Sequence, residues 1–234
     1  MLSSYPSVVP EVETMRRVCA GASLARYGDG EFKHCSGNRN VSQEYVPALT
    51  ERLRAILHAS GSCMVGIPSL DRCDQMTPEK SAFWMRHAFA AQWLVPREYV
   101  SAFVTRPDSA PWIDTPAYWG MVESLWLGQD VTLVRGSSKG LNSDDLMGAG
   151  AVTEVVCPRQ HAFAEYDRIL DRVGTPKRAL ICLGPTATVL AVDLCARGVH
   201  AIDLGHIALF IRKFRRGEPM TLTKDDKSHD KVTV

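Results

Sequence analysis

Short apolar runs of strand length alternate along this chain with segments whose apolar residues recur at helical spacing. The clearest strand-like runs are residues 24–27, 63–67, 131–134 and 179–183. Continuous apolar runs are typical of strands buried on both faces, and alternation with helices favours a parallel sheet. We therefore predict an α/β fold: a single Rossmann-like domain over residues 1–216, with a mostly parallel, doubly wound sheet flanked by helices.

The same patterns locate the other elements. Three more strands are predicted, over 99–105, 152–157 and 199–203. Helices are predicted where apolar residues recur every three or four positions, over 10–20, 46–57, 77–91, 116–127, 163–173 and 187–197. Residues 217–234 are predicted to form a polar, solvated and mobile C-terminal tail.

Composition narrows the function classes. With 234 residues, of which 45% are hydrophobic, the chain can bury one substantial core. Its 27 basic and 26 acidic residues leave a net charge of +1, so no nucleic-acid partner is expected. No membrane span and no signal peptide are expected. The seven cysteines form no C-x-x-C pair, which favours a reducing cytoplasm over a disulfide framework or zinc site.

The first strand-like run leads into Arg-Tyr-Gly-Asp-Gly-Glu at residues 26–31. Gly28 lets the backbone turn sharply and approach a ligand closely. Asp29 and Glu31 are hard oxygen ligands, and such a pair suits Mg²⁺ or Mn²⁺ when a substrate diphosphate and water complete the coordination. The alternative is an ordinary Asp-Gly turn with a solvated glutamate.

Gly184, Pro185 and Thr186 stand between a predicted buried strand and a helix. The free N–H groups of such a helix start suit a phosphate, with an ordinary helix start capped by Thr186 as the alternative. The loop at 136–140 similarly fits a phosphate cradle or a flexible turn. Because ligands of open parallel sheets bind beyond the carboxyl ends of the strands, these loops are expected to converge there with Arg26 and with residues 203–206.

Taken together, R-Y-G-D-G-E at 26–31, L-G-P-T-A-T-V-L-A-V-D-L at 183–194 and I-D-L-G-H-I at 202–207 resemble the GT-D-type bacterial glycosyltransferases. This resemblance implies a GT-D-type, Rossmann-like fold and a nucleotide-sugar donor, with UDP as the expected nucleotide. It also implies a metal site of Mn²⁺ or Mg²⁺ at Asp29 and Glu31. The donor-binding residues it indicates are Arg26, Gly28, Gly184, Pro185 and Thr186.

The expected acceptor is a hydroxyl of a glycan or glycoprotein, as in polysaccharide biosynthesis, and a lipid-linked acceptor is left open. A homo-oligomer is left open too. The segment at 207–216 mixes apolar and basic residues. It fits either weak contact with the inner face of a membrane or packing onto the body of the protein.

The chain departs from the family pattern after Gly205 and His206. Family members commonly carry acidic residues there, whereas residues 207–211 read Ile-Ala-Leu-Phe-Ile. The catalytic base is therefore assigned to His206 first, since histidine titrates near neutrality, with Asp203 as a second catalytic residue. Backbone N–H groups are expected to lower the pKa of Asp203 and to weaken it as a base. Asp144 and Asp145 are the reserve candidates.

Two other functions remain open. One is a metal-dependent hydrolase of nucleotide sugars or phosphoesters, in which water replaces the acceptor. The other is a catalytically degenerate module that binds a nucleotide sugar without turning it over, which the missing acidic residues after His206 would favour.

Overall fold

The structure is a computed structural model that describes residues 5–136, 140–222 and 226. Within these residues, eight strands form one sheet in the order β1-β4-β3-β2-β8-β7-β5-β6. All seven strand pairs are parallel. The strands are β1 Val8–Val9, β2 Leu24–Arg26, β3 Met64–Ile67, β4 Tyr99–Ser101, β5 Val131–Arg135, β6 Val152–Val156, β7 Arg178–Cys182 and β8 His200–Asp203.

The helices join and cover these strands. The α-helices are α1 Glu11–Cys19, α2 Asp29–Cys35, α3 Pro47–His58, α4 Pro78–Met85, α5 Pro116–Glu123, α6 Tyr166–Val173, α7 Pro185–Ala196 and α8 Ile207–Arg216. The 3₁₀ segments are η2 Leu70–Gln75, η3 Ala88–Trp93, η4 Ala102–Thr105, η5 Pro111–Ile113, η6 Ser143–Asp145 and η7 Ala162–Glu165. The predicted α/β class and parallel, doubly wound sheet are confirmed.

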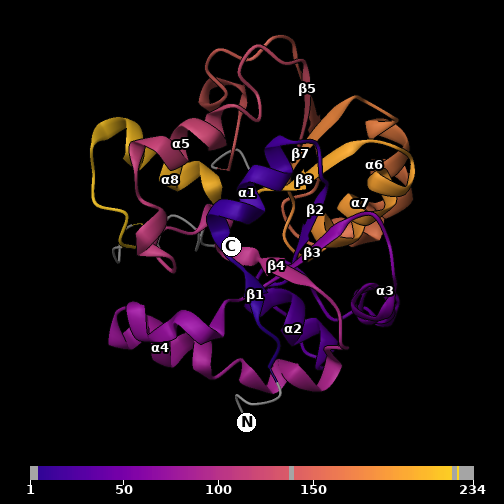
Figure 1. Cartoon of the computed structure of the whole chain (residues 1–234). Coiled ribbons are helices and arrows are strands. Elements are labelled where there is room, and N and C mark those ends of the chain that lie inside the picture. Colours follow the sequence, from indigo (N-terminus) through magenta and orange to yellow (C-terminus); the bar gives the residue numbers. More distant parts are fainter. Residues whose placement is uncertain (1–4, 137–139, 223–225, 227–234) are drawn as a thin grey trace.

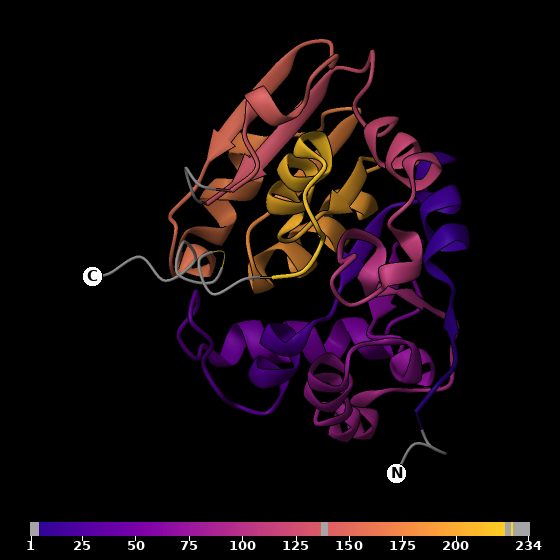
Figure 2. The ribbon, with the colours of Figure 1, turned by 90° about the vertical axis from the view of Figure 1, so that its left-hand side faces the viewer.

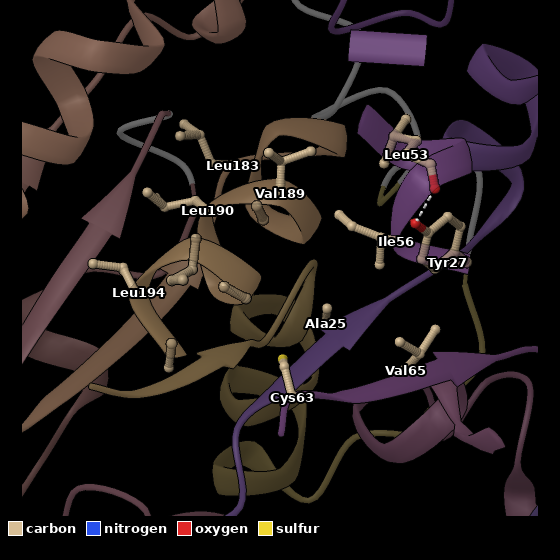
Figure 3. Packing of buried hydrophobic residues seen from close by; sticks show 14 of the residues in the cluster. Ala25, Tyr27, Leu53, Ile56, Cys63, Val65, Leu183, Val189, Leu190 and Leu194 are labelled. Atoms are coloured by element: carbon tan, nitrogen blue, oxygen red, sulfur yellow. Dashed lines mark hydrogen bonds between the residues drawn. The ribbon is translucent and has the colours of Figure 1, made fainter. Parts of the chain in front are cut away.

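Two hydrophobic clusters pack on opposite faces of the sheet. Figure 1 shows α6 and α7 on one side of the strands and α5 and α8 on the other. The cluster beneath α3, α6 and α7 includes Tyr27, whose hydroxyl donates to the carbonyl of Leu53 at 2.6 Å (Figure 3). The cluster on the other face includes Trp126, which is fully buried. In Figure 2, the yellow helix α8 lies in front of the strands on that second face.

Two predicted elements end early, and local hydrogen bonds explain one of them. The strand predicted over 99–105 stops at Ser101, whose hydroxyl accepts the N–H of Phe103 at 3.0 Å and starts η4. This side-chain acceptor competes with the sheet ladder for the backbone. The helix predicted over 77–91 divides into α4 and η3, although Thr77 caps its start as expected by accepting the N–H of Lys80 at 3.4 Å.

Helix α8 settles how the amphipathic segment at 207–216 is used. Its residues Ile207, Phe210 and Ile211 are buried in the second cluster. Its basic side chains pair with carboxylates, as Arg212 does with Asp145 at 2.6 Å and Lys213 with Asp226 at 3.0 Å. The alternative of packing onto the body therefore holds. Across the described residues, every helix is too short or too polar to span a bilayer.

The predicted polar tail starts after α8. Met220 is buried in the second cluster and Asp226 reaches Lys213, so these two residues depart from the expected solvated tail. Residues 223–225 and 227–234 lie outside the described residues, and so do 137–139 of the predicted phosphate loop.

Candidate active site

The candidate site lies where β2, β7 and β8 end, because all three strands are parallel and β8 lies between β2 and β7. Arg26 is the last residue of β2, and Asp203 is the last residue of β8. Gly184 follows β7 and begins α7. The topology thus brings to one edge three segments that the sequence separates, as predicted.

A buried arginine stands at the centre of this edge. The Arg26 side chain is only 10% exposed, and its Nη2 lies 3.4 Å from Oδ1 of Asp203. Its Nη1 donates to the carbonyl oxygen of Ala102 at 3.0 Å and to the hydroxyl of Thr105. Ala102 and Thr105 belong to η4, which follows β4, so Arg26 contacts residues from both sides of β2 in the sheet order. Its buried Nε has no hydrogen-bond partner among the described residues.

Gly205 makes room for this guanidinium. Its φ is +52°, and a Cβ built on it would lie 1.9 Å from Nη2 of Arg26. The backbone N–H of Gly205 donates to Oδ1 of Asp203 at 2.9 Å. A side chain at this position would therefore displace Arg26 from Asp203.

We expect Gly205→Ala to destabilise the fold by more than the roughly 1–3 kcal/mol that a strained backbone costs. The matched control is Gly217→Ala, since Gly217 also has a positive φ, +63°, but a Cβ added there would meet nothing within 4 Å. Urea unfolding of both variants measures the difference. Equal losses in the two variants would show that the contact with Arg26 contributes nothing.

The pKa of Asp203 differs from the prediction. The expected hydrogen bond from a backbone N–H is present, at Gly205. Burial nevertheless raises the pKa of the carboxyl, although the charge of Arg26 and the amide of Gly205 oppose that rise. The prediction of a lowered pKa was wrong because a local sequence pattern carries no measure of how deeply the end of β8 is buried.

Asp29 and Glu31 lie in the first turn of α2, so this segment is a helix start rather than the ordinary Asp-Gly turn that was the alternative. Gly28 is the N-cap, and its N–H donates to Oε2 of Glu31 at 2.7 Å, which fixes the glutamate at the helix end. The Asp29 side chain is 38% exposed and pairs with Lys33 at 2.8 Å. The two carboxylates are thus held on one turn, with neighbouring positive charge at Lys33.

The electrostatics of these two carboxylates differ. Burial raises the pKa of Glu31 to about 7; the Gly28 N–H opposes the rise, and the charges of Asp203 and Asp29 add to it. For Asp29, burial alone would raise the pKa, but the hydrogen bond from Lys33 and the nearby charges of Lys33, His87 and Arg106 hold it below its ordinary value. The negative charges of Asp29 and Asp203 therefore disfavour the charged form of Glu31.

The second predicted loop forms the start of α7. Gly184, with φ +56°, is its N-cap and Pro185 its first helical residue, so Thr186 is not the cap. Thr186 is 1% exposed, and its Oγ1 has no hydrogen-bond partner among the described residues. By contrast, the hydroxyl of Thr188 donates to the carbonyl of Arg26 at 2.8 Å and ties α7 to β2.

The two helix starts meet through glycines. A Cβ on Gly30 would lie 3.8 Å from Cγ of Pro185 and 2.8 Å from Nδ2 of Asn40. A Cβ on Gly184 would lie 3.0 Å from Oγ of Ser42. The acidic turn of α2 and the first turn of α7 are therefore neighbours, and side chains from residues 36–46 pack against both.

Sequence reasoning missed the segment at 36–46. Oδ1 of Asn40 accepts the N–H groups of Ser42 and Gln43 at 2.9 and 2.8 Å, which folds the segment into a tight turn. The N–H of His161 then donates to the carbonyl of Ser42 at 2.9 Å, and His161 itself has a positive φ of 56°. The Asn-Val-Ser-Gln pattern at 40–43 is a recognisable Asx turn, but its contacts with residues 161 and 184 had no local signal.

The candidate bases have different environments. His206 is exposed and is the N-cap residue of α8, directly after Gly205. Asp145 is buried, and Arg212 donates to both of its carboxylate oxygens, at 2.8 and 2.6 Å. The reserve candidate Asp145 is therefore held in a buried ion pair, whereas the other reserve candidate, Asp144, is exposed.

Within the described residues, no cluster of three or more histidine, cysteine, aspartate or glutamate side chains has the geometry of a metal site. A cation at Asp29 and Glu31 would therefore depend on oxygen atoms from a substrate and from water. Such partial protein coordination is normal for Mg²⁺ in sites that also bind phosphates.

An open parallel sheet with polar loops at its carboxyl edge is the architecture of the nucleotide-binding α/β proteins. A family model described as the glycosyltransferase GT-D fold matches residues 24–231, and the chain belongs to this family. The resemblance to the GT-D-type glycosyltransferases is therefore confirmed.

Two similar proteins are named as glycosyltransferases. The probable glycosyl transferase Gly of Streptococcus gordonii is 30% identical over 215 residues, which are 84% of this chain and 31% of that protein. Glycosyltransferase GlyD of Streptococcus pneumoniae serotype 4 is 29% identical over 202 residues, which are 80% of this chain and 25% of that protein. The chain thus spans less than a third of the length of these two curated relatives.

Solved structures agree in fold. One of them is described as the domain of unknown function 1792, which has a distinct glycosyltransferase fold. It superposes with a TM-score of 0.84 at 30% sequence identity, and the match covers 94% of this chain and 85% of that chain. A second, described as a new glycosyltransferase from Streptococcus sanguinis, has a TM-score of 0.79 at 28% identity, covering 91% and 85%.

Proposed function

We propose that this chain transfers a sugar from a nucleotide-diphosphate donor, with UDP as nucleotide, to a hydroxyl of a glycan or glycoprotein acceptor. The observation that carries the proposal is the contact between the two helix starts. Gly30 in the acidic turn adjoins Pro185 in the first turn of α7. A diphosphate between them would accept hydrogen bonds from the first N–H groups of α7. On its other side it would face the carboxylates of α2, whose negative charge requires a cation between them and the phosphates.

A divalent cation, Mn²⁺ or Mg²⁺, fits this arrangement because Asp29 and Glu31 place two hard oxygen ligands on one turn and concentrate negative charge there. When bound, such a cation neutralises the charge that develops on a leaving diphosphate. Lys33 would exchange its partner Asp29 for solvent or phosphate. Glu31 would keep its bond to the Gly28 N–H through Oε2, leaving its other oxygen for coordination.

The chain's own groups would carry the rest of the reaction. The first N–H groups of α7 and the hydroxyl of Thr186 would bind phosphate oxygens, and Arg26 would add fixed positive charge at the end of β2. His206 would accept the proton of the acceptor hydroxyl while the oxygen of that hydroxyl bonds to the anomeric carbon of the sugar. The bond from that carbon to the phosphate oxygen breaks, and the nucleotide diphosphate leaves.

Incubation with UDP-sugars and Mn²⁺ separates this proposal from its rivals. Transfer predicts that sugar release is slow without an acceptor and increases when a glycan acceptor is added. A hydrolase would release the sugar at full rate into water. A binding module would show thermal stabilisation by the donor with no release under any condition, and at 100 times its Kd a ligand stabilises by roughly 2.7 kcal/mol.

The buried hydroxyl of Thr186 gives a sharper test of the donor position. We expect Thr186→Val to weaken donor binding by about 1–3 kcal/mol, because a bound phosphate would lose its partner. The free energy of unfolding should stay level or rise, since Oγ1 has no partner to lose among the described residues. Calorimetric titration and urea unfolding measure the two quantities.

Thr188→Val is the matched control. Its hydroxyl donates to the carbonyl of Arg26, so the substitution should cost about 1 kcal/mol of folding stability. A Thr186→Val protein that binds donor like the unsubstituted chain would place the phosphates elsewhere.

A further inference from the structure

Two thiols lie together at the edge of the sheet opposite the candidate active site. Cys63 directly precedes β3, and Cys195 is in the last turn of α7. Both line one surface pocket of about 230 Å³, together with Ser62, Arg97 and Val192. Figure 3 shows Cys63 at the start of its strand, beneath the helices that form the first hydrophobic cluster.

The sulfur of Cys195 has polar neighbours that stabilise a negative charge. The hydroxyl of Ser62 lies 3.3 Å from this sulfur, and Cys63, the residue after Ser62, lines the same pocket. The polar influence of the Cys63 thiol, followed by that of the Ser62 and Ser23 hydroxyls, lowers the pKa of Cys195 to about 5 against the opposing effect of burial. The pKa of Cys63 is raised, first by the neighbouring Cys195 and then by burial. The thiolate is the reactive form of cysteine, so Cys195 is the nucleophile of the pair.

Cys195, the thiol with the lowered pKa, is also the more solvent-accessible of the two. Cys195 is partly exposed at the pocket, whereas Cys63 is only 6% exposed. An accessible thiol with a buried thiol beside it in the same pocket is the arrangement of a reacting and a resolving cysteine.

The other cysteines lack this combination. Cys35, Cys73 and Cys157 are buried, and burial raises the pKa of each. Cys182 is partly exposed, but burial raises the pKa of its thiol as well. Cys19 is partly exposed like Cys195, but its sulfur contacts the Met121 carbonyl at 3.4 Å and the Ser124 hydroxyl at 3.5 Å rather than sharing a pocket with a second thiol. Cys19 is therefore a natural control for a thiol of similar exposure.

We propose that Cys63 and Cys195 form an oxidation site, at which a peroxide converts the two thiols into an intramolecular disulfide. The Cys195 thiolate attacks one peroxide oxygen, the O–O bond breaks, and the hydroxide that leaves takes up a proton to become water. Cys195 is then a sulfenic acid. The Cys63 sulfur attacks that sulfur, the S–S bond forms as the S–O bond breaks, and a second water leaves with the Cys63 proton. Two thiols are oxidised by two electrons in total, and one hydrogen peroxide is reduced to two waters.

The disulfide would join the start of β3 to the end of α7, two elements far apart in the sequence. A cross-link that closes so long a loop removes many conformations from the unfolded chain. Helix α7 begins at the candidate active site, where Gly184 is its N-cap, and Cys195 lies in its last turn. Oxidation would therefore fix the end of α7 that is remote from the candidate active site.

The test uses the reduced full chain titrated with hydrogen peroxide, alkylated, and analysed by intact mass and peptide mapping. We expect the oxidised chain to carry two fewer alkyl groups than the reduced chain, a peptide cross-link between Cys63 and Cys195, and a Tm increase of about 5 °C or more that dithiothreitol reverses. Cys63→Ser should instead accumulate a sulfenic acid at Cys195, trapped by dimedone. Cys19→Ser should form the same disulfide as the unsubstituted chain.

Three results would overturn the inference. The first is oxidation of Cys19 before Cys195, and the second is a sulfenic acid at Cys195 that persists while Cys63 is present. The third is that Cys63 and Cys195 both remain free thiols at peroxide doses that oxidise the buried cysteines. The measurement on the unsubstituted chain decides the question even if a variant folds poorly.

Discussion

Asp29→Asn and Glu31→Gln should each abolish the Mn²⁺-dependent part of UDP-sugar binding. Both substitutions keep the shape of the side chain, and a glutamine oxygen can still accept the Gly28 N–H that Glu31 accepts at 2.7 Å. Helix α2 should therefore still form. What is lost is the negative charge that would hold the cation.

The expected size of this effect is at least the 10–100-fold that changes next to metal ligands typically cost, since these residues would be the ligands themselves. Calorimetric titration of donor with and without Mn²⁺ measures it. Glu51→Gln on α3 is the control, because Glu51 is an exposed carboxylate on a different helix from Asp29 and Glu31. If both active-site variants keep the full response to Mn²⁺, the metal site is not at this turn.

His206→Ala should lower kcat for transfer by about 10²–10⁴-fold while donor binding stays nearly unchanged, as expected when a general base is removed. The reason lies in α8. Residues 207–211 carry no carboxylate, and Ala208 and Phe210 are buried in the core. Asp145 is held by Arg212, which leaves His206 as the exposed titratable residue directly after β8.

The kinetic split between the two constants decides the role of His206. Loss of donor affinity with saturated turnover intact would make His206 a donor contact and would move the search for a base to Asp144. His58→Ala is the control, because His58 is exposed at the end of α3 and lines a pocket with the start of β3, at the opposite edge of the sheet. Its turnover should match that of the unsubstituted chain.

The sequence predicts the elements of this fold well because their signals are local. Apolar periodicity located every strand from β2 to β8 and the main helices, and Thr77 with Pro78 marked the start of α4. It missed the two-residue strand β1, which is too short to carry a pattern. Where side chains redirect the backbone, as Ser101 does, the prediction of 99–105 as a strand ran too far.

The site was harder to predict, because its geometry depends on contacts between distant residues. The motifs identified which segments meet at the carboxyl edge, but not that Gly28 and Glu31 form a capping pair rather than a turn. The spacing of a cap residue followed three positions later by glutamate is itself a helix-start signal, which the two glycines obscured. Long-range contacts such as Arg212 with Asp145, or Ser42 with Gly184, have no signal in a single sequence.

The central claim is that a nucleotide diphosphate and its cation bind between the starts of α2 and α7. A crystal structure of the chain with UDP and Mn²⁺, with the anomalous signal of manganese recorded, tests it most directly. We predict an anomalous peak within coordination distance of Asp29 and Glu31, with phosphate oxygens on the first N–H groups of α7 and on Thr186. A manganese peak remote from both carboxylates, or phosphates away from Gly184, would contradict the account.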